Sequence, residues 1–260
     1  MDPARPGSRQ KGQTTVSVSD LADSRAATNA LLEMVREGRW SPRALARFLS
    51  TAARRSVRQA ALRPRALAQA TAAHGVLLVL ARDRAGRRWV LTSWTLVVLH
   101  LGLLEHRDRF AAADALTLVR GNLPATALGA GRASGVLAVA LDLADGHLAR
   151  RGATVSPFGD YADSLADAAF WTWLAIRHEP GRALRAAAVA AWVAPVAAMT
   201  AAGFGRGAMP HRPRPTLLRP AATLQVVVAL RHLRRAPRSR TAGPPTPPRP
   251  GLHARRRHGS

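Results

Sequence analysis

The sequence predicts an all-α protein, a polytopic bundle of membrane-spanning helices preceded by an amphipathic helical region. Several apolar segments in the middle of the chain approach the ~20 residues that a helix needs to cross a bilayer. Two Ser-Pro pairs have the form of a helix start, a capping residue followed by proline in the first turn. Aspartates recur at helical spacing within the apolar region. The mean hydropathy of −0.07 averages this apolar middle with polar ends.

The composition is strongly basic, with a formal net charge of +24. Such a charge favours nucleic acid or an anionic membrane surface as a partner. We expect no nucleic-acid partner, because aromatic residues make up only 5% of the chain and no groove-reading motif is present. The chain has no cysteine, which excludes disulfides and thiolate metal sites. The first residues lack the apolar core of a secretory signal, so we expect residue 1 to stay in the cytosol.

The N-terminal part of the chain predicts a disordered arm followed by two helices. Residues 1–20 are polar and without periodicity. Within the amphipathic region, residues 21–63, the stretch 22–37 predicts a helix with an apolar stripe of Leu31, Leu32 and Val35. Ser41-Pro42 opens a basic helix with apolar residues on one side. That helix is suited to an anionic membrane surface, and a soluble helix that packs on a partner is the alternative.

Seven apolar segments are candidate membrane spans. Two of them, 66–81 and 89–104, form a predicted hairpin. The segments 110–128, 135–148 and 156–176 follow, the last opened by Ser156-Pro157. Residues 184–204, with a predicted kink at Pro195, and 217–230 complete the set. The basic, proline-rich tail 235–260 is predicted to be disordered.

Four aspartates within these apolar segments are the strongest functional signal. Asp142 and Asp145 lie three residues apart on one predicted helix, and Asp163 and Asp167 lie four apart on the next. Such carboxylates repel one another in a low-dielectric setting unless a cation lies between them. Oxygen ligands without cysteine suit Mg2+ or Mn2+. The two pairs therefore predict a metal site that could hold two ions.

These residues belong to a longer pattern, Asp142-x2-Asp145-Gly146-x2-Ala149-Arg150-x8-Gly159-x3-Asp163-x3-Asp167. The pattern resembles the complete signature of the CDP-alcohol phosphatidyltransferase family of integral membrane enzymes. The segment Leu116 to Arg120 is similar to an element that opens the first core helix of that family. Two positions depart from the family pattern: Asp114 stands where an Asn is common, and Ala168 follows the last aspartate in place of a basic residue.

The resemblance implies roles for individual residues. The metal ligands would be Asp142, Asp145, Asp163 and Asp167, and Asp167 would be the catalytic base, a role that the sequence does not separate from ligation. The resemblance also implies that the substrate contacts Gly146, Ala149, Arg150, Gly159, Thr117 and Arg120. For Asp160, in the first turn of its helix, we prefer a favourable interaction with the helix dipole over a role in the site.

The resemblance further implies a core of about six membrane helices, which we assign to a transferase domain at residues 64–234. The family has four spans downstream of the first acidic pair, whereas this sequence offers three there and two additional segments upstream. The basic turn at Arg150 and Arg151 predicts an active site that faces the cytoplasm of a multi-pass cell-membrane protein.

The implied reaction moves a phosphatidyl group from CDP-diacylglycerol to a polar alcohol, with release of CMP, in phospholipid biosynthesis. Two alternatives are transfer of a CDP-linked small alcohol to a lipid acceptor and an inactive membrane scaffold of the same fold. The expected partners are the two substrates and membrane lipids, and a homodimer is an open alternative. The sequence does not identify the acceptor alcohol.

Overall fold

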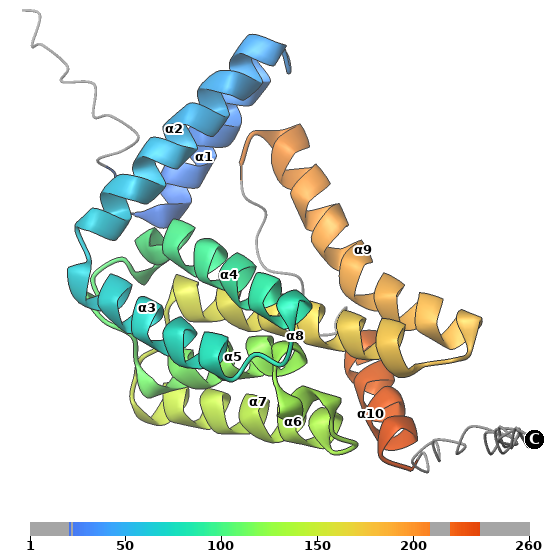
Figure 1. Cartoon of the computed structure of the whole chain (residues 1–260). Coiled ribbons are helices and arrows are strands. Elements are labelled where there is room, and N and C mark those ends of the chain that lie inside the picture. Colours follow the sequence, from blue (N-terminus) through green and yellow to red (C-terminus); the bar gives the residue numbers. More distant parts are fainter. Residues whose placement is uncertain (1–20, 22, 209–218, 235–260) are drawn as a thin grey trace, which may run out of the picture.

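The computed structural model describes residues 21, 23–208 and 219–234, and these form helices joined by loops, with no strand among them (Figure 1). The predicted all-α class is confirmed. The predicted arm and tail, residues 1–20 and 235–260, lie outside the described part of the chain. The helices in chain order are α1 (Ser24–Glu37), α2 (Pro42–Ala61), α3 (Pro64–Val79), α4 (Arg84–Leu99), η2 (Leu101–Leu104), α5 (Ala112–Asn122), η3 (Leu123–Ala125), α6 (Ala127–Ala130), α7 (Ser134–Arg151), α8 (Pro157–His178), α9 (Arg182–Arg206) and α10 (Arg219–Arg234).

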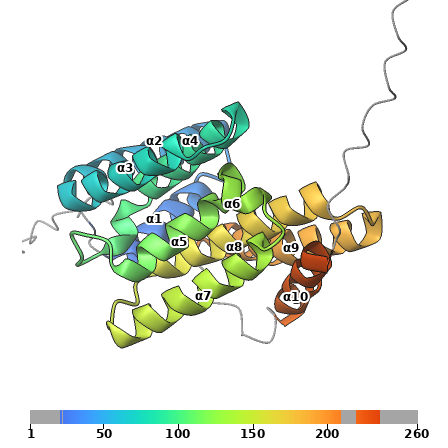
Figure 2. The ribbon, with the colours of Figure 1, turned by 60° about the horizontal axis from the view of Figure 1, so that its bottom comes forward.

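The centre of the molecule is formed by α5, which packs against both α7 and α8 (Figure 2). Small residues allow close approach: a Cβ atom at Gly121 of α5 would lie only 3.2 Å from the Cβ atom of Ala166 on α8. Further along α8, the large side chains of Phe170, Trp171 and Leu174 are buried in the core. Burial of this apolar surface stabilises α8 in place between its neighbours.

The N-terminal helices form two hairpins, α1 with α2 and α3 with α4. The predicted stripe of Leu31, Leu32 and Val35 is buried, as expected. Asp23 caps α1, and hydrogen bonds from the backbone N–H groups of Ala26 and Arg25 hold the pKa of its carboxyl below the usual value.

The first of the two Ser-Pro helices, α2, exposes apolar side chains and buries polar ones. Its apolar side chains Leu49 and Val57 are 63% and 68% exposed, whereas Arg55 and Gln59 are buried. The guanidinium of Arg55 donates to the carbonyl oxygen of Leu21 at 2.8 Å. An exposed apolar face beside many arginines is compatible with the predicted contact with a membrane surface.

Among the described residues, α9 is the one helix that is long and apolar enough to cross a membrane. Only 11% of the residues in the apolar stretch of α9 are buried against the rest of the protein. The predicted bundle of about six spans is therefore not confirmed. Helix α4 has 16 residues, about 24 Å at 1.5 Å per residue, whereas a bilayer core is about 30 Å thick.

Breaks in two predicted spans explain their short helices. The segment 89–104 leaves the α-helical conformation at Leu99 and continues as a 3-10 turn. The segment 110–128 breaks after Asn122, because Pro124 cannot donate the backbone hydrogen bond that a continuing helix needs. Pro195, in contrast, lies inside α9 without ending it.

Candidate functional site

The candidate site lies where α5, α7 and α8 meet. Helix α7 supplies Asp142 and Asp145, and α8 supplies Asp163 and Asp167. Within each pair the spacing of three or four residues places both carboxylates on one helix face. The structure brings the two predicted acidic pairs together around one side chain of α5, Arg120.

Arg120 is fully buried, with its guanidinium among the four carboxylates. Its Nη1 donates to Oδ1 of Asp142 at 2.6 Å and to Oδ2 of Asp145 at 3.2 Å. Its Nη2 donates to Oδ1 of Asp163, and its Nε lies 3.3 Å from Oδ1 of Asp167. The sequence predicted that Arg120 contacts substrate. In the structure it pairs with the predicted metal ligands.

The local charge balance is strongly negative, because one guanidinium faces four carboxylates. Asp145 and Asp167 are largely buried, at 7% and 15% side-chain exposure, whereas Asp142 and Asp163 are about half exposed, at 45% and 46%. Burial makes uncompensated charge costly. Asp142 and Asp163 are thus the carboxylates through which a further cation could reach the cluster from solvent.

Thr117 reinforces the buried side of the cluster. Its hydroxyl donates to Oδ2 of Asp145 at 2.8 Å, and it lies one helical turn before Arg120. Asp145 therefore accepts from both α5 side chains and is held in a single orientation. The two residues singled out from the segment Leu116 to Arg120 orient the carboxylates in this structure.

The carboxylates fit a divalent metal ion. Oxygen atoms of Asp142, Asp145 and Asp163 lie within 4.8 Å of one another. A set of hard oxygen donors with excess negative charge is the type of site that Mg2+ or Mn2+ occupies. Asp167, the fourth predicted ligand, lies outside this group of three.

A cavity of about 330 Å³ opens beside the carboxylates, between α5, α7 and the start of α8. Its walls include the predicted substrate residues Gly146, Ala149, Arg150 and Gly159, together with Thr117, Asp142, Asp145 and Asp163. The glycines leave room at the wall: a Cβ atom at Gly146 would lie 3.1 Å from Nη1 of Arg150. A small cavity bordered by carboxylates and by Arg150, which forms no ion pair with a described residue, suits a phosphate-bearing ligand whose charge a cation neutralises.

Asp160 also lines this cavity. Its place in the first turn of α8 agrees with the predicted favourable interaction with the helix dipole.

Sequence reasoning missed the role of Arg107. Its Nη1 lies 3.0 Å from Oδ2 of the buried Asp114, and its Nη2 donates to the hydroxyl of Ser156 at 2.6 Å. Ser156 also caps α8 by accepting from the backbone N–H of Gly159. Arg107 thus links the start of α5 to the start of α8 at the wall of the cavity. Its position in an irregular loop carries no periodic signal in the sequence.

Asp167 lies one helical turn after Asp163 on α8 and is contacted from a further helix, α10. Besides Arg120, Asp167 contacts Gln225 of α10, whose Nε2 lies 3.5 Å from its Oδ2. Sequence reasoning did not single out Gln225, because α10 is remote in the chain from the acidic pairs.

A carboxylate cluster beside a small cavity is an arrangement that can hold divalent metal ions for phosphoryl-group chemistry. A family model described as CDP-alcohol phosphatidyltransferase matches residues 111–235 of the chain. The resemblance predicted from the sequence is confirmed. The family implies transfer of a phosphatidyl or phosphoalcohol group from a CDP-alcohol, in a membrane. Comparisons with curated proteins and with solved structures give no match.

Proposed function

We propose that this protein is an integral membrane transferase that moves a phosphatidyl group from CDP-diacylglycerol to a polar alcohol and releases CMP. The observation that carries the proposal is the convergence of Asp142, Asp145 and Asp163 at the wall of a cavity within the matched domain. Transferase residues would occupy 64–234, and the amphipathic region 21–63 would lie at the membrane surface.

The proposed metal ligands are Asp142, Asp145 and Asp163, with Asp167 completing a site for two ions if it ligates. A bound Mg2+ or Mn2+ ion would neutralise charge on the pyrophosphate and on departing CMP. Gly146, Ala149 and Gly159 leave space for the nucleotide, and Arg150 binds a phosphate oxygen at the cavity wall.

In the proposed reaction, the acceptor hydroxyl oxygen attacks the phosphorus that carries the diacylglycerol. A new P–O bond forms to the acceptor, and the bond from that phosphorus to the bridging oxygen breaks, so that CMP leaves with the electron pair. Asp167 takes the proton of the acceptor hydroxyl. Arg120 keeps the carboxylates of both helices in one orientation throughout, because it contacts all four of them.

CMP release tests this function. Detergent-solubilised protein would receive Mg2+, CDP-diacylglycerol and one acceptor at a time: glycerol 3-phosphate, inositol phosphate, serine or phosphatidylglycerol. We expect CMP release with one acceptor and none in EDTA. A parallel reaction contains a CDP-linked small alcohol and diacylglycerol. CMP release in that reaction alone would show that the protein transfers a CDP-linked small alcohol to a lipid acceptor. No release in any reaction would indicate an inactive scaffold.

Asp167→Asn separates the two roles of the last aspartate. Binding of Mg2+ to the folded protein should raise its Tm. Because Asp167 lies outside the three-carboxylate group, we expect Mg2+ to raise the Tm of the variant as well. CMP release should fall about 10²–10⁴-fold, the usual contribution of a general base. Loss of the Mg2+ effect together with activity would show that Asp167 is a metal ligand.

A further inference from the structure

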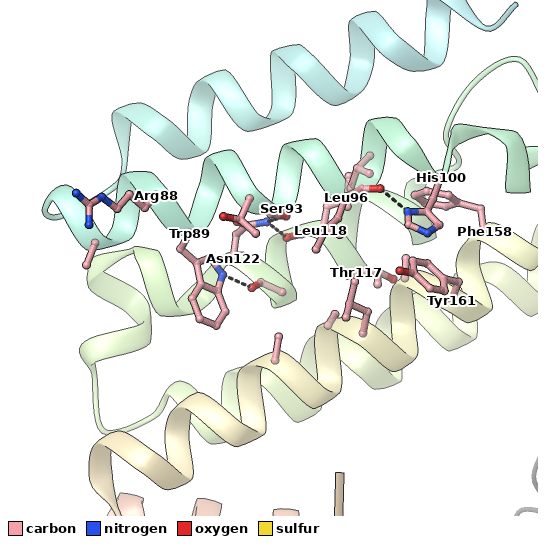
Figure 3. Close-up of a pocket in the computed structure, with 18 of the residues that line it drawn as sticks. Arg88, Trp89, Ser93, Leu96, His100, Thr117, Leu118, Asn122, Phe158 and Tyr161 are labelled. Atoms are coloured by element: carbon pink, nitrogen blue, oxygen red, sulfur yellow. Dashed lines mark hydrogen bonds between the residues drawn. The ribbon is translucent and has the colours of Figure 1, made fainter. Parts of the chain in front are cut away.

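A second cavity, of about 670 Å³, lies between α4, α5 and α8. Figure 3 shows its lining, with α4 along one side and α8 along the other. Most of the lining is apolar, including Leu96 and Val97 of α4, Leu118 of α5, and Ala162 and Leu165 of α8. Its volume is in the range of ligand-binding pockets. Helix α4, which supplies one wall of the cavity, lies outside the segment that matches the family, whereas the α5 and α8 walls lie within it.

One end of the cavity is cationic. Arg84 and Arg88 line it from the first turns of α4, and Arg88 and Trp89 lie together at that end in Figure 3. Both arginines are exposed, and neither makes an ion pair with a described residue. The neighbouring carboxylate, Asp83, caps α4 by accepting from the backbone N–H of Gly86 at 2.7 Å. Two arginines one helical turn apart can bind one phosphate group together.

The other end is closed by rings. His100 at the end of α4 stacks on Tyr161 of α8, with ring centroids 4.3 Å apart. His100 follows Arg88 by twelve positions, which corresponds to about 18 Å along the helix. Tyr161 is two residues from Asp163, so the ring end, not the cationic end, is level with the acidic cluster. An anion held at Arg88 is therefore well separated from the proposed metal ligands.

A buried polar atom also faces this space. Asn122 lines the cavity and is fully buried, and its Oδ1 has no hydrogen-bond partner within the part of the chain that the structure describes. Its Nδ2 donates to Ser93 Oγ at 2.9 Å, and Ser93 contacts Nε2 of His74 at 3.1 Å. A buried acceptor without a partner is costly, and a ligand hydroxyl or a water molecule would satisfy it.

We propose that this cavity binds an anionic phospholipid, with the headgroup phosphate at Arg84 and Arg88 and one acyl chain along the apolar lining towards His100 and Tyr161. Charge complementarity selects the headgroup, and the long apolar groove selects the chain. This lipid is separate from the proposed donor, whose phosphates would lie at the carboxylates. The site depends on α4, and it does not depend on the transferase activity.

Lipid binding to the full-length protein in detergent tests the proposal. Native mass spectrometry would follow titrations with dioleoyl phosphatidic acid, with dioleoyl phosphatidylcholine and with inorganic phosphate. We expect one tightly bound phosphatidic acid and weaker binding of phosphatidylcholine. Arg84→Gln with Arg88→Gln should weaken phosphatidic acid binding about 30-fold. Thr92→Trp, which introduces a large ring at an exposed position of the lining, should abolish it.

The matched control is Arg82→Gln with Arg87→Gln, which removes the same charge from exposed arginines outside the lining. It should bind phosphatidic acid as the unaltered protein does. Equal weakening in both double variants would show that binding depends on the overall positive charge and not on Arg84 and Arg88. Asp163→Asn should also bind normally, whereas loss there would place the lipid in the transferase site. Competition by inorganic phosphate at similar affinity would show a simple anion site. Normal binding of phosphatidic acid by Thr92→Trp would place the acyl chain outside this cavity.

Each of these contrary results, equal weakening in both double variants and loss of binding in Asp163→Asn included, would overturn the proposal.

Discussion

Asp163→Asn is expected to lower CMP release at least about 10³-fold, because it removes a carboxylate on which the electrostatic stabilisation of the pyrophosphate depends. Asp163 is half exposed at the cavity and is one of the three clustered carboxylates. The amide has nearly the same shape, so the packing of α8 should be preserved. The measurements are CMP release at saturating Mg2+ and the rise in Tm caused by Mg2+, which should shrink with the activity.

Asp108→Asn provides the matched control for this change. Asp108 pairs with Arg65 at the surface, with both side chains more than half exposed. Exposed pairs of this type contribute about 0–1 kcal/mol to stability. CMP release and the Mg2+ effect should therefore stay unchanged. Full activity of Asp163→Asn would exclude the acidic cluster as the reaction centre.

Arg120→Met is expected to destabilise the metal-free protein by about 3–5 kcal/mol, because it leaves buried carboxylates without their cationic partner. Methionine retains much of the length of the side chain without its charge. Mg2+ should then raise Tm more in the variant than in the unaltered protein, since removal of a positive charge from the site increases its affinity for a cation. Thermal unfolding in detergent, with EDTA and with Mg2+, measures both effects.

Arg65→Met is the corresponding control, because it removes an exposed arginine from a single surface carboxylate. Its stability and its response to Mg2+ should match those of the unaltered protein. If Mg2+ raised the Tm of Arg120→Met by no more than it raises that of the control, Arg120 would have no part in balancing the charge of the cluster.

The helices and the acidic residues were largely predictable from local sequence. Ser41-Pro42 and Ser156-Pro157 do open helices, because a side-chain cap and a proline in the first turn act within a few residues. The i, i+3 and i, i+4 spacing of the aspartates likewise predicted that each pair shares a face. The number of membrane spans was harder to predict, because apolar composition does not report where a helix breaks, as it does after Leu99 and after Asn122.

By itself, the sequence determined the all-α class, the signature of the family and the carboxylates at the candidate site, since these depend on residue types at short spacing. Only the tertiary structure showed that those carboxylates surround the guanidinium of Arg120. The sequence singled out Arg120 but not its pairing with the carboxylates, and it did not single out Arg107 or Gln225, because these contacts join segments that are distant in the chain. Only the packing of α4 against α5 and α8 creates the larger apolar cavity, because a cavity is a property of helices brought together.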